Sequence, residues 1–339
     1  MIEKAKSPVS KLWSLRTLRT ASEVVRETSL GVNRWDRTLR ELVVTAPISF
    51  EAKKFIKSEN QISESGRHGF LGAAIYLMEG YPQKHPDFLS IWCDTSFHHF
   101  TGRVFDDYID KDDEKSSIQR LDALQIDSIL IGKRPPSVDS LEKEAVTYLL
   151  SESVKRFKNK GSYLKEALKS VFAIRSIEEH KTGKGEYRIN EMDHSVAVYY
   201  VTPVIEIVRG YGYRVSSQTK EAILHLSKGA RIMDHLADLF SDLQTGAYNP
   251  ILQEARETFG QKGKKTFHFI QKYLSDKYFQ QAYEEFSFGE QQLTGRPKEI
   301  YKAMAGLATA KYLTQYFLSI NHATLGFVPR MIRPFIRSF

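Results

Sequence analysis

Cysteine is almost absent from this sequence: Cys93 is the only one among 339 residues. A disulfide framework and a zinc site built from cysteines are therefore excluded, and the composition is typical of a reducing compartment. Glycine (20) and proline (11) are too few for a fibrous or low-complexity chain. Long hydrophobic runs are also missing, because the most apolar stretch, Val196 to Ile205, has about half the length of a bilayer span. We expect a cytoplasmic protein.

Hydrophobic residues make up 41% of the chain and aromatic residues 12%, which is enough to bury a sizeable core. Lys and Arg (49) exceed Asp and Glu (41), so the surface favours anionic partners such as phosphorylated ligands, nucleic acid or acidic lipids. The C-terminal segment from Phe327 to Phe339 interleaves Arg330, Arg333 and Arg337 with apolar side chains. Such a tail fits either an anionic membrane surface or packing on its own domain, and both interpretations stay open.

Apolar residues recur at helical spacing through most of the sequence, and windows that alternate as a strand would are scarce. Clusters of Gly and Pro separate the periodic segments. The predicted helices cover 66–80, 92–111, 140–157, 163–177, 193–209, 217–243, 265–286 and 297–320. We therefore predict an all-α protein, with a basic N-terminal arm and first helices at 1–60, one helical domain at 61–325 and a basic aromatic tail at 326–339.

A first acidic motif lies in the sequence FDDYIDKDDE, which starts at residue 105. Asp106 and Asp110 share a helix face at i and i+4, with Asp107 beside them. Two carboxylates at so short a distance repel each other, and a bound divalent cation removes this repulsion. Mg²⁺ needs only one or two carboxylate ligands, because water and phosphate oxygens complete its coordination shell. The alternative interpretation is a helix end that enters a solvated acidic loop.

A second acidic motif places Asp234, Asp238 and Asp242 at i, i+4 and i+8 on one helix face. The residues between them are mostly apolar, which is typical of a largely buried helix. Unpaired carboxylates on such a helix are costly unless cations compensate them. The alternative is a surface stripe in which Arg231 neutralises part of the row through an i,i+3 pair.

Together the two motifs resemble the class I terpenoid synthase family, in which a DDxxD motif precedes a second metal motif with ligands at i, i+4 and i+8. Asp106, Asp107 and Asp110 match the first motif; the second matches in spacing but consists of aspartates only. The resemblance spans roughly residues 90–320. It implies a single-domain helical bundle of that type, in which the six aspartates bind three Mg²⁺ ions.

The resemblance also implies the activity and further site residues. Family members carry a diphosphate-sensing Arg 46 positions before the second motif, and that position is Arg188. Arg188 would act with Asp106, Asp107 and Asp110 in ionising an isoprenyl diphosphate of the farnesyl or geranylgeranyl type. The carbocation would then cyclise in an apolar pocket. The predicted substrate contacts are Arg188, Arg231, Lys311, Tyr312, Phe97, Phe100, Tyr199, Tyr200 and Phe240.

Two other functions are weighed against a cyclase. Paired DxxxD words also resemble squalene and phytoene synthases, which join two prenyl chains. A basic helical protein that binds nucleic acid is the alternative from another class, but the basic residues are dispersed and no nucleic-acid-binding motif is present, so we expect no nucleic acid partner. Membrane contact through the tail and a homodimer stay open.

Overall fold

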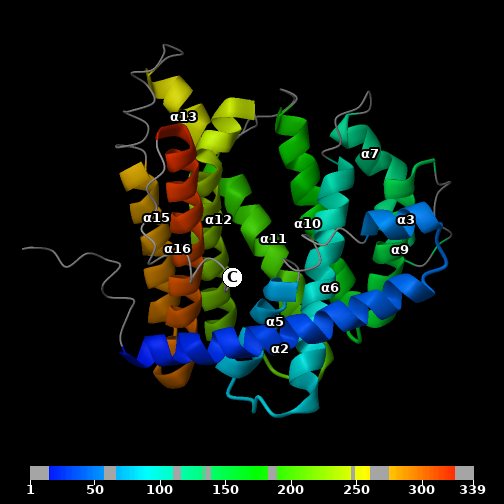
Figure 1. Ribbon diagram of the computed structural model, residues 1–339, viewed down its shortest axis with the longest axis horizontal. Coiled ribbons are helices and arrows are strands. Elements are labelled where there is room, and N and C mark those ends of the chain that lie inside the picture. The colour runs from blue at the N-terminus through cyan, green and yellow to red at the C-terminus, as the bar shows by residue number, and fades with distance from the viewer. Residues whose placement is uncertain are drawn as a thin grey trace, which may run out of the picture. The chain divides into compact units, whose positions relative to one another are not determined.

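The computed structural model describes residues 15–56, 66–109, 116–131, 133, 139–181, 189–245, 249–259 and 275–324. All regular structure in these ranges is helical, which confirms the all-α prediction for this part of the chain (Figure 1). The helices are α2 (Leu15–Thr45), α3 (Phe50–Ile56), α5 (Phe70–Met78), α6 (Pro86–Ile109), α7 (Ser117–Leu124), α8 (Ile126–Leu130), α9 (Leu141–Arg156), α10 (Lys160–Lys181), α11 (Ile189–Gly210), α12 (Ser217–Thr245), α13 (Pro250–Phe259), α15 (Ser275–Gln291) and α16 (Gly295–Thr324).

The chain divides into two compact units. The first comprises Met1–Val25, Ile189–Val198 and Ser217–Phe339, and the second comprises Arg26–Arg188 and Tyr199–Ser216. The predicted tail at 326–339 lies outside the described residues, whereas the predicted arm at 1–60 contains α2 and α3. None of the described helices has the combination of length and hydropathy that crossing a bilayer requires.

In the first unit α12 packs against α15 and α16, and the three helices run side by side in Figure 1. Two glycines allow this close packing. A Cβ atom on Gly229 of α12 would overlap the ring of Phe286, and one on Gly289 of α15 would overlap the hydroxyl group of Tyr301. The absence of a side chain at both positions therefore fixes how closely α15 approaches its neighbours.

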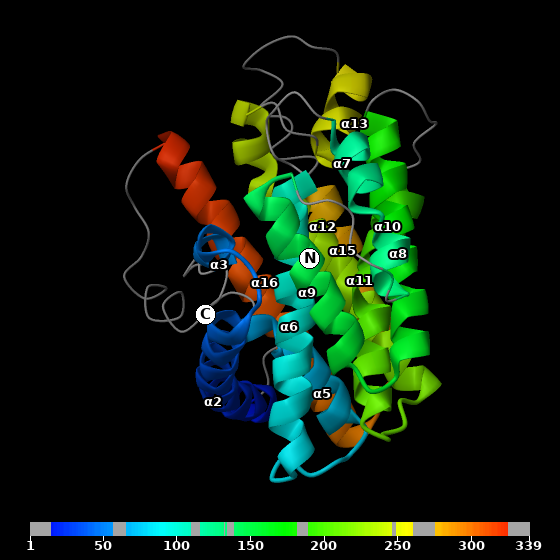
Figure 2. The same cartoon turned by 90° about the vertical axis from the view of Figure 1, so that its right-hand side faces the viewer.

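In the second unit α6 packs against α5, α7 and α9, and Figure 2 shows it running beside α5 and α9. Its apolar side chains belong to a core that is built around Trp35 of α2. Phe157, which directly follows α9, and Tyr163 of α10 belong to the same core. The sequence fixes where two of the surrounding helices begin. Ser116 and Gln119 form a capping box at the start of α7, and Ser140 caps α9.

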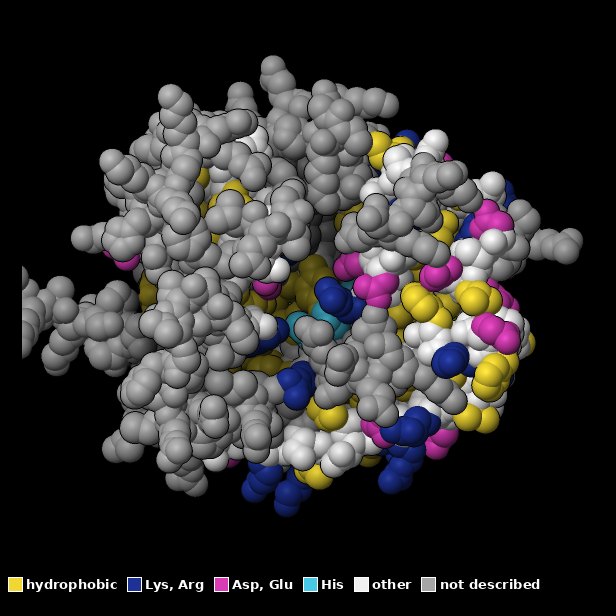
Figure 3. All heavy atoms as spheres, turned by 45° about the horizontal axis from the view of Figure 1, so that its top comes forward, with side chains coloured by type: hydrophobic (Ala, Val, Ile, Leu, Met, Phe, Trp, Pro, Cys, Tyr) yellow, Lys and Arg dark blue, Asp and Glu magenta, His cyan; other side chains and the backbone are white. Residues whose placement is uncertain are grey.

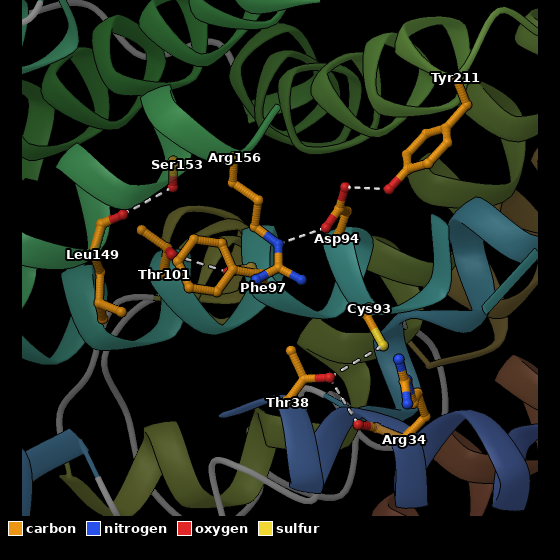
Figure 4. A network of polar contacts seen from close by, with 10 residues as sticks. All are labelled: Arg34, Thr38, Cys93, Asp94, Phe97, Thr101, Leu149, Ser153, Arg156 and Tyr211. Carbon is orange, nitrogen blue, oxygen red and sulfur yellow. Dashed lines mark hydrogen bonds and ion pairs between the residues drawn. The ribbon is translucent and has the colours of Figure 1, made fainter. Parts of the chain in front are cut away.

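An ion pair between the buried Asp94 and the half-buried Arg156 ties α6 to α9 within this unit (Figure 4). Arg156 Nε lies 2.5 Å from Asp94 Oδ1, and the Tyr211 hydroxyl donates to Asp94 Oδ2 over 2.7 Å. The Arg156 guanidinium also lies over the ring of Phe97, 5.3 Å from its centroid. Since Tyr211 directly follows α11, one carboxylate joins three segments that are distant in the sequence. Burial, followed by the charge of Asp94, raises the pKa of Tyr211 above its ordinary value, so the phenol stays protonated and keeps donating.

Candidate functional site

The second acidic motif lies on α12 of the first unit, where the sequence predicts it. Asp234 and Asp242 are half-buried, and Asp238 between them is exposed. Met233, Leu236 and Leu239 on the rest of the helix are buried. The apolar side chains therefore anchor the helix in the unit and leave the aspartate row at its edge.

Arg231 pairs with the first carboxylate of the row, with Nη1 3.1 Å from Asp234 Oδ2. This i,i+3 pair is the contact on which the surface-stripe interpretation depends, and it is present. Both side chains are more than a third exposed, so the pair contributes at most about 1 kcal/mol to stability. Arg231 neutralises one end of the row and leaves the charge on the other two aspartates to be balanced by other groups.

Asn249 holds the last carboxylate of the row. Its side-chain amide donates to Asp242 Oδ2 over 2.8 Å and to the carbonyl oxygen of His235 over 2.9 Å. Its side-chain oxygen accepts from the backbone N–H of Ile251 over 3.0 Å, which caps the start of α13. The Asn249 residue itself is buried. Sequence reasoning missed this contact, although an Asn directly before Pro250 at a helix start is a signal for a cap.

The middle carboxylate of the row has a perturbed acidity. Partial removal from water, and then the charges of Asp234 and Asp242, raise the pKa of Asp238 from 3.8 to about 6. Arg231 and Lys311 act in the opposite direction. A carboxylate whose charge is disfavoured by its neighbours is one that a bound cation would stabilise.

The charge of Lys311 on α16 lowers the pKa of Asp238, so this predicted site residue acts electrostatically on the row from another helix of the same unit. The Lys311 ammonium lies over the ring of Tyr312, 5.1 Å from the ring centroid. In the first unit Arg231 thus contacts Asp234, Lys311 contacts Tyr312, and the charge of Lys311 acts on Asp238.

The donor chemistry of the row fits Mg²⁺. Carboxylate oxygens are its preferred ligands, and one or two suffice when phosphate and water supply the rest. Asp234 and Asp242 are eight residues apart, about 12 Å along the axis, so the three aspartates cannot converge on one ion. No three His, Cys, Asp or Glu side chains gather into a metal-holding group anywhere in the described ranges. An ion bound by this row would therefore need further donors, such as water or phosphate oxygens.

The first acidic motif lies at the end of α6 in the second unit. Asp106 and Asp107 are half-buried on the last turns of this helix, whereas Asp110 lies outside the described residues. The helix ends at Ile109, whose carbonyl oxygen accepts a 2.8 Å hydrogen bond from the buried guanidinium of Arg120. This contact fixes the C-terminal turn that carries Asp106 and Asp107.

The predicted aromatic contacts divide into three groups. Phe97 and Phe100 are fully buried in the core of the second unit, each in edge contact with Trp35, so core packing accounts for both rings. Tyr200 is half-buried, and its hydroxyl contacts Nδ1 of His99. The side chains of Tyr199 and Phe240 lie outside the described part of the structure, as does Arg188.

Charges of both signs are interspersed with hydrophobic side chains on the described part of the face in Figure 3.

Comparison with known proteins leaves the family open. No protein-family model matches this chain, and no curated protein matches it.

Proposed function

We propose that this protein is a Mg²⁺-dependent class I terpene synthase, which ionises an isoprenyl diphosphate and cyclises the resulting carbocation. The observation that supports the proposal most strongly is the α12 row, in which Asp238 has a raised pKa beside Lys311 and Asp242 is held by Asn249. Repulsion among these carboxylates destabilises the protein without a bound cation, and a bound cation would remove this repulsion.

The residues divide the work between them in this proposal. Asp234, Asp238 and Asp242 of the first unit would bind Mg²⁺, and Asp106 and Asp107 of the second unit would form the other metal-binding motif. Mg²⁺, when bound, would neutralise the diphosphate and stabilise it as a leaving group. Lys311 would donate a charge-assisted hydrogen bond to a diphosphate oxygen. The carbon–oxygen bond then breaks, its electron pair leaves with the diphosphate, and an allylic cation remains.

The proposal is tested by incubating the full chain with Mg²⁺ and geranyl, farnesyl or geranylgeranyl diphosphate, and analysing the products by mass spectrometry. A cyclase yields hydrocarbons with the carbon number of the substrate, whereas a squalene- or phytoene-synthase-like enzyme yields twice that number. If the chain releases no diphosphate from any of the three substrates, the proposal is wrong.

Two paired substitutions locate the activity on the acidic motifs. Asp234→Asn combined with Asp238→Asn, and Asp107→Asn combined with Asp110→Asn, should each reduce turnover by at least about 100-fold because charge stabilisation of the leaving group is lost. Asp122→Asn is the matched control, since Asp122 is an exposed carboxylate that pairs with Arg175 at 2.7 Å. Wild-type turnover in a double variant would remove that motif from the site.

A further inference from the structure

Two tyrosine–histidine contacts lie side by side in the second unit. The Tyr200 hydroxyl of α11 contacts Nδ1 of His99 on α6, and the Tyr163 hydroxyl of α10 lies 2.9 Å from Nδ1 of the adjacent His98. The His99 ring also stacks on the ring of His68, with 3.6 Å between centroids. Imidazole and phenol side chains can carry protons. The metal and diphosphate ligands proposed above do not include these two tyrosine–histidine pairs.

His99 shares a face of α6 with the first acidic motif. His99, Gly102 and Asp106 follow one another at i, i+3 and i+7, so they lie on one side of the helix. His99 and Asp106 are two turns apart, about 10 Å along the axis. Among the described residues, no atom outside the helix's own backbone and the two neighbours of Gly102 lies within 4 Å of the position that a Cβ on Gly102 would occupy, so these residues leave the face uncovered at Gly102.

The His98 contact has a different environment. Burial lowers the pKa of His98 to about 4 and raises that of Tyr163 above its ordinary value. The Tyr163 ring packs against Phe157, 4.2 Å between centroids, within the core of the unit. This second contact is therefore structural, and it provides an internal comparison for the first.

We propose that Tyr200 and His99 together accept the proton that the carbocation loses when the reaction ends; this inference rests on the proposed function. A carbocation is acidic enough to lose a proton to any base nearby, so the position of the base decides which C–H bond breaks. In this proposal, a prenyl chain whose diphosphate is bound at Asp106 would extend along this face of α6, past Gly102, towards the pair.

The proton transfer balances without any further reactant. A C–H bond next to the cationic carbon breaks, and its electron pair forms the C=C bond of the product. The proton passes to the Tyr200 oxygen while the phenolic proton moves to Nδ1 of His99, which carries no proton in the tautomer that accepts from Tyr200. The positive charge of the substrate ends as an imidazolium ion.

The test compares Tyr200→Phe and His99→Asn with Tyr163→Phe, which removes the matched hydroxyl from His98. Each full-length variant is incubated with Mg²⁺ and whichever prenyl diphosphate the wild type consumes, and both diphosphate release and product distribution are measured. Ionisation precedes proton loss. The first two variants should therefore release diphosphate at a rate close to that of the wild type, while their product distribution changes. The share of the wild-type olefin should fall about tenfold, with isomeric olefins or alcohols in its place.

Tyr163→Phe should leave the product distribution unchanged. Circular dichroism establishes that each variant is folded, and Tyr200→Phe keeps the ring and its packing if His99→Asn does not fold. Wild-type product ratios in Tyr200→Phe, with diphosphate still released, would overturn the assignment of the pair and leave the proposed function standing. If the wild type releases no diphosphate, the proposed function and this inference fail together.

Discussion

The side-chain amide of Asn249 donates a 2.8 Å hydrogen bond to Oδ2 of Asp242. The same amide group reaches the carbonyl oxygen of His235, so Asn249 joins the start of α13 to two turns of α12. A carboxylate that is oriented in this way loses less freedom when it binds a cation, as is general for groups that support metal ligands. Asn249 is therefore a positioning residue for the α12 row.

Replacing Asn249 by Ala should destabilise the protein by about 2 kcal/mol, since both the helix cap and the bond to Asp242 are lost. The affinity for Mg²⁺ in the presence of inorganic diphosphate should fall about tenfold, as is typical when a supporting partner of a ligand is removed. Chemical denaturation measures the first effect and calorimetric titration the second.

Asn159→Ala is the control for this change. Asn159 also donates to a carboxylate, Glu206 Oε2, over 3.0 Å, but it belongs to the second unit. It should cost stability and leave Mg²⁺ affinity unchanged. Equal losses of metal affinity in the two variants would show that Asn249 acts through general stability alone.

Asp238→Asn should stabilise the metal-free protein at pH 7. The pKa of Asp238 is about 6 in the folded protein and 3.8 when unperturbed, so the folded state binds more protons than the unfolded state between these values. Stability in the wild type therefore falls as pH rises through this window. The variant does not lose this stability. Its free energy of unfolding at pH 7 should exceed that of the wild type by about 1 kcal/mol, after allowance for solvent screening at an exposed side chain.

Urea denaturation in EDTA at pH 4 and pH 7 measures this difference, which should be absent at pH 4. Added Mg²⁺ should stabilise the wild type more than the variant, because the ion compensates the charge that asparagine lacks. Asp122→Asn, at the exposed pair with Arg175, should bring no gain at pH 7. An Asp238→Asn protein no more stable than the wild type at pH 7 would disprove the electrostatic cost of the row.

Lys311→Met should weaken the binding of Mg²⁺-diphosphate by about tenfold, which corresponds to one lost charge-assisted hydrogen bond. Lys277→Met is matched to it, because Lys277 lies over the ring of the adjacent Tyr278 at 5.3 Å, much as Lys311 lies over Tyr312. The Lys277 variant should bind diphosphate as the wild type does. Similar affinities in both variants would exclude Lys311 from the site.

Removing the carboxylate at Asp94 should destabilise the protein by about 3 kcal/mol, because Asp94→Ala leaves the Arg156 charge and the Tyr211 hydroxyl without their partner. The exposed pair of Asp36 and Arg40 provides the contrast, and Asp36→Ala should cost less than about 0.5 kcal/mol. Thermal unfolding followed by circular dichroism compares the two. Equal costs would show that the Asp94 pair has no special structural role.

Sequence periodicity predicts the helix of the second motif closely, because the prediction of 217–243 corresponds to α12 at Ser217–Thr245. The helix of the first motif is predicted at 92–111 but extends from Pro86 to Ile109, so its start is predicted six residues too late. The spacing of Asp234, Asp238 and Asp242 also predicts a shared face correctly, because helix geometry alone determines it.

Contacts between helices are less accessible to sequence reasoning. α6 is buried around most of its circumference and mixes polar with aromatic residues, so spacing alone does not predict which of its aromatic side chains face the core. The burial of Phe97 and Phe100 against Trp35 depends on α2. The contact of Tyr200 with His99 joins residues 101 positions apart, and it depends on tertiary packing. Local pattern carries no information about such a pair, whereas the cap that Asn249 provides has a local signal in the following Pro250.

Calorimetric titration of the full chain with inorganic diphosphate, in Mg²⁺ and in EDTA, tests the central claim most directly. We expect binding in Mg²⁺, none in EDTA, and a loss of at least about tenfold in affinity when Asp238→Asn is combined with Asp242→Asn. Diphosphate binding that is equal in Mg²⁺ and EDTA, or unchanged in the double variant, would contradict the claim that the α12 row holds a metal-bound diphosphate.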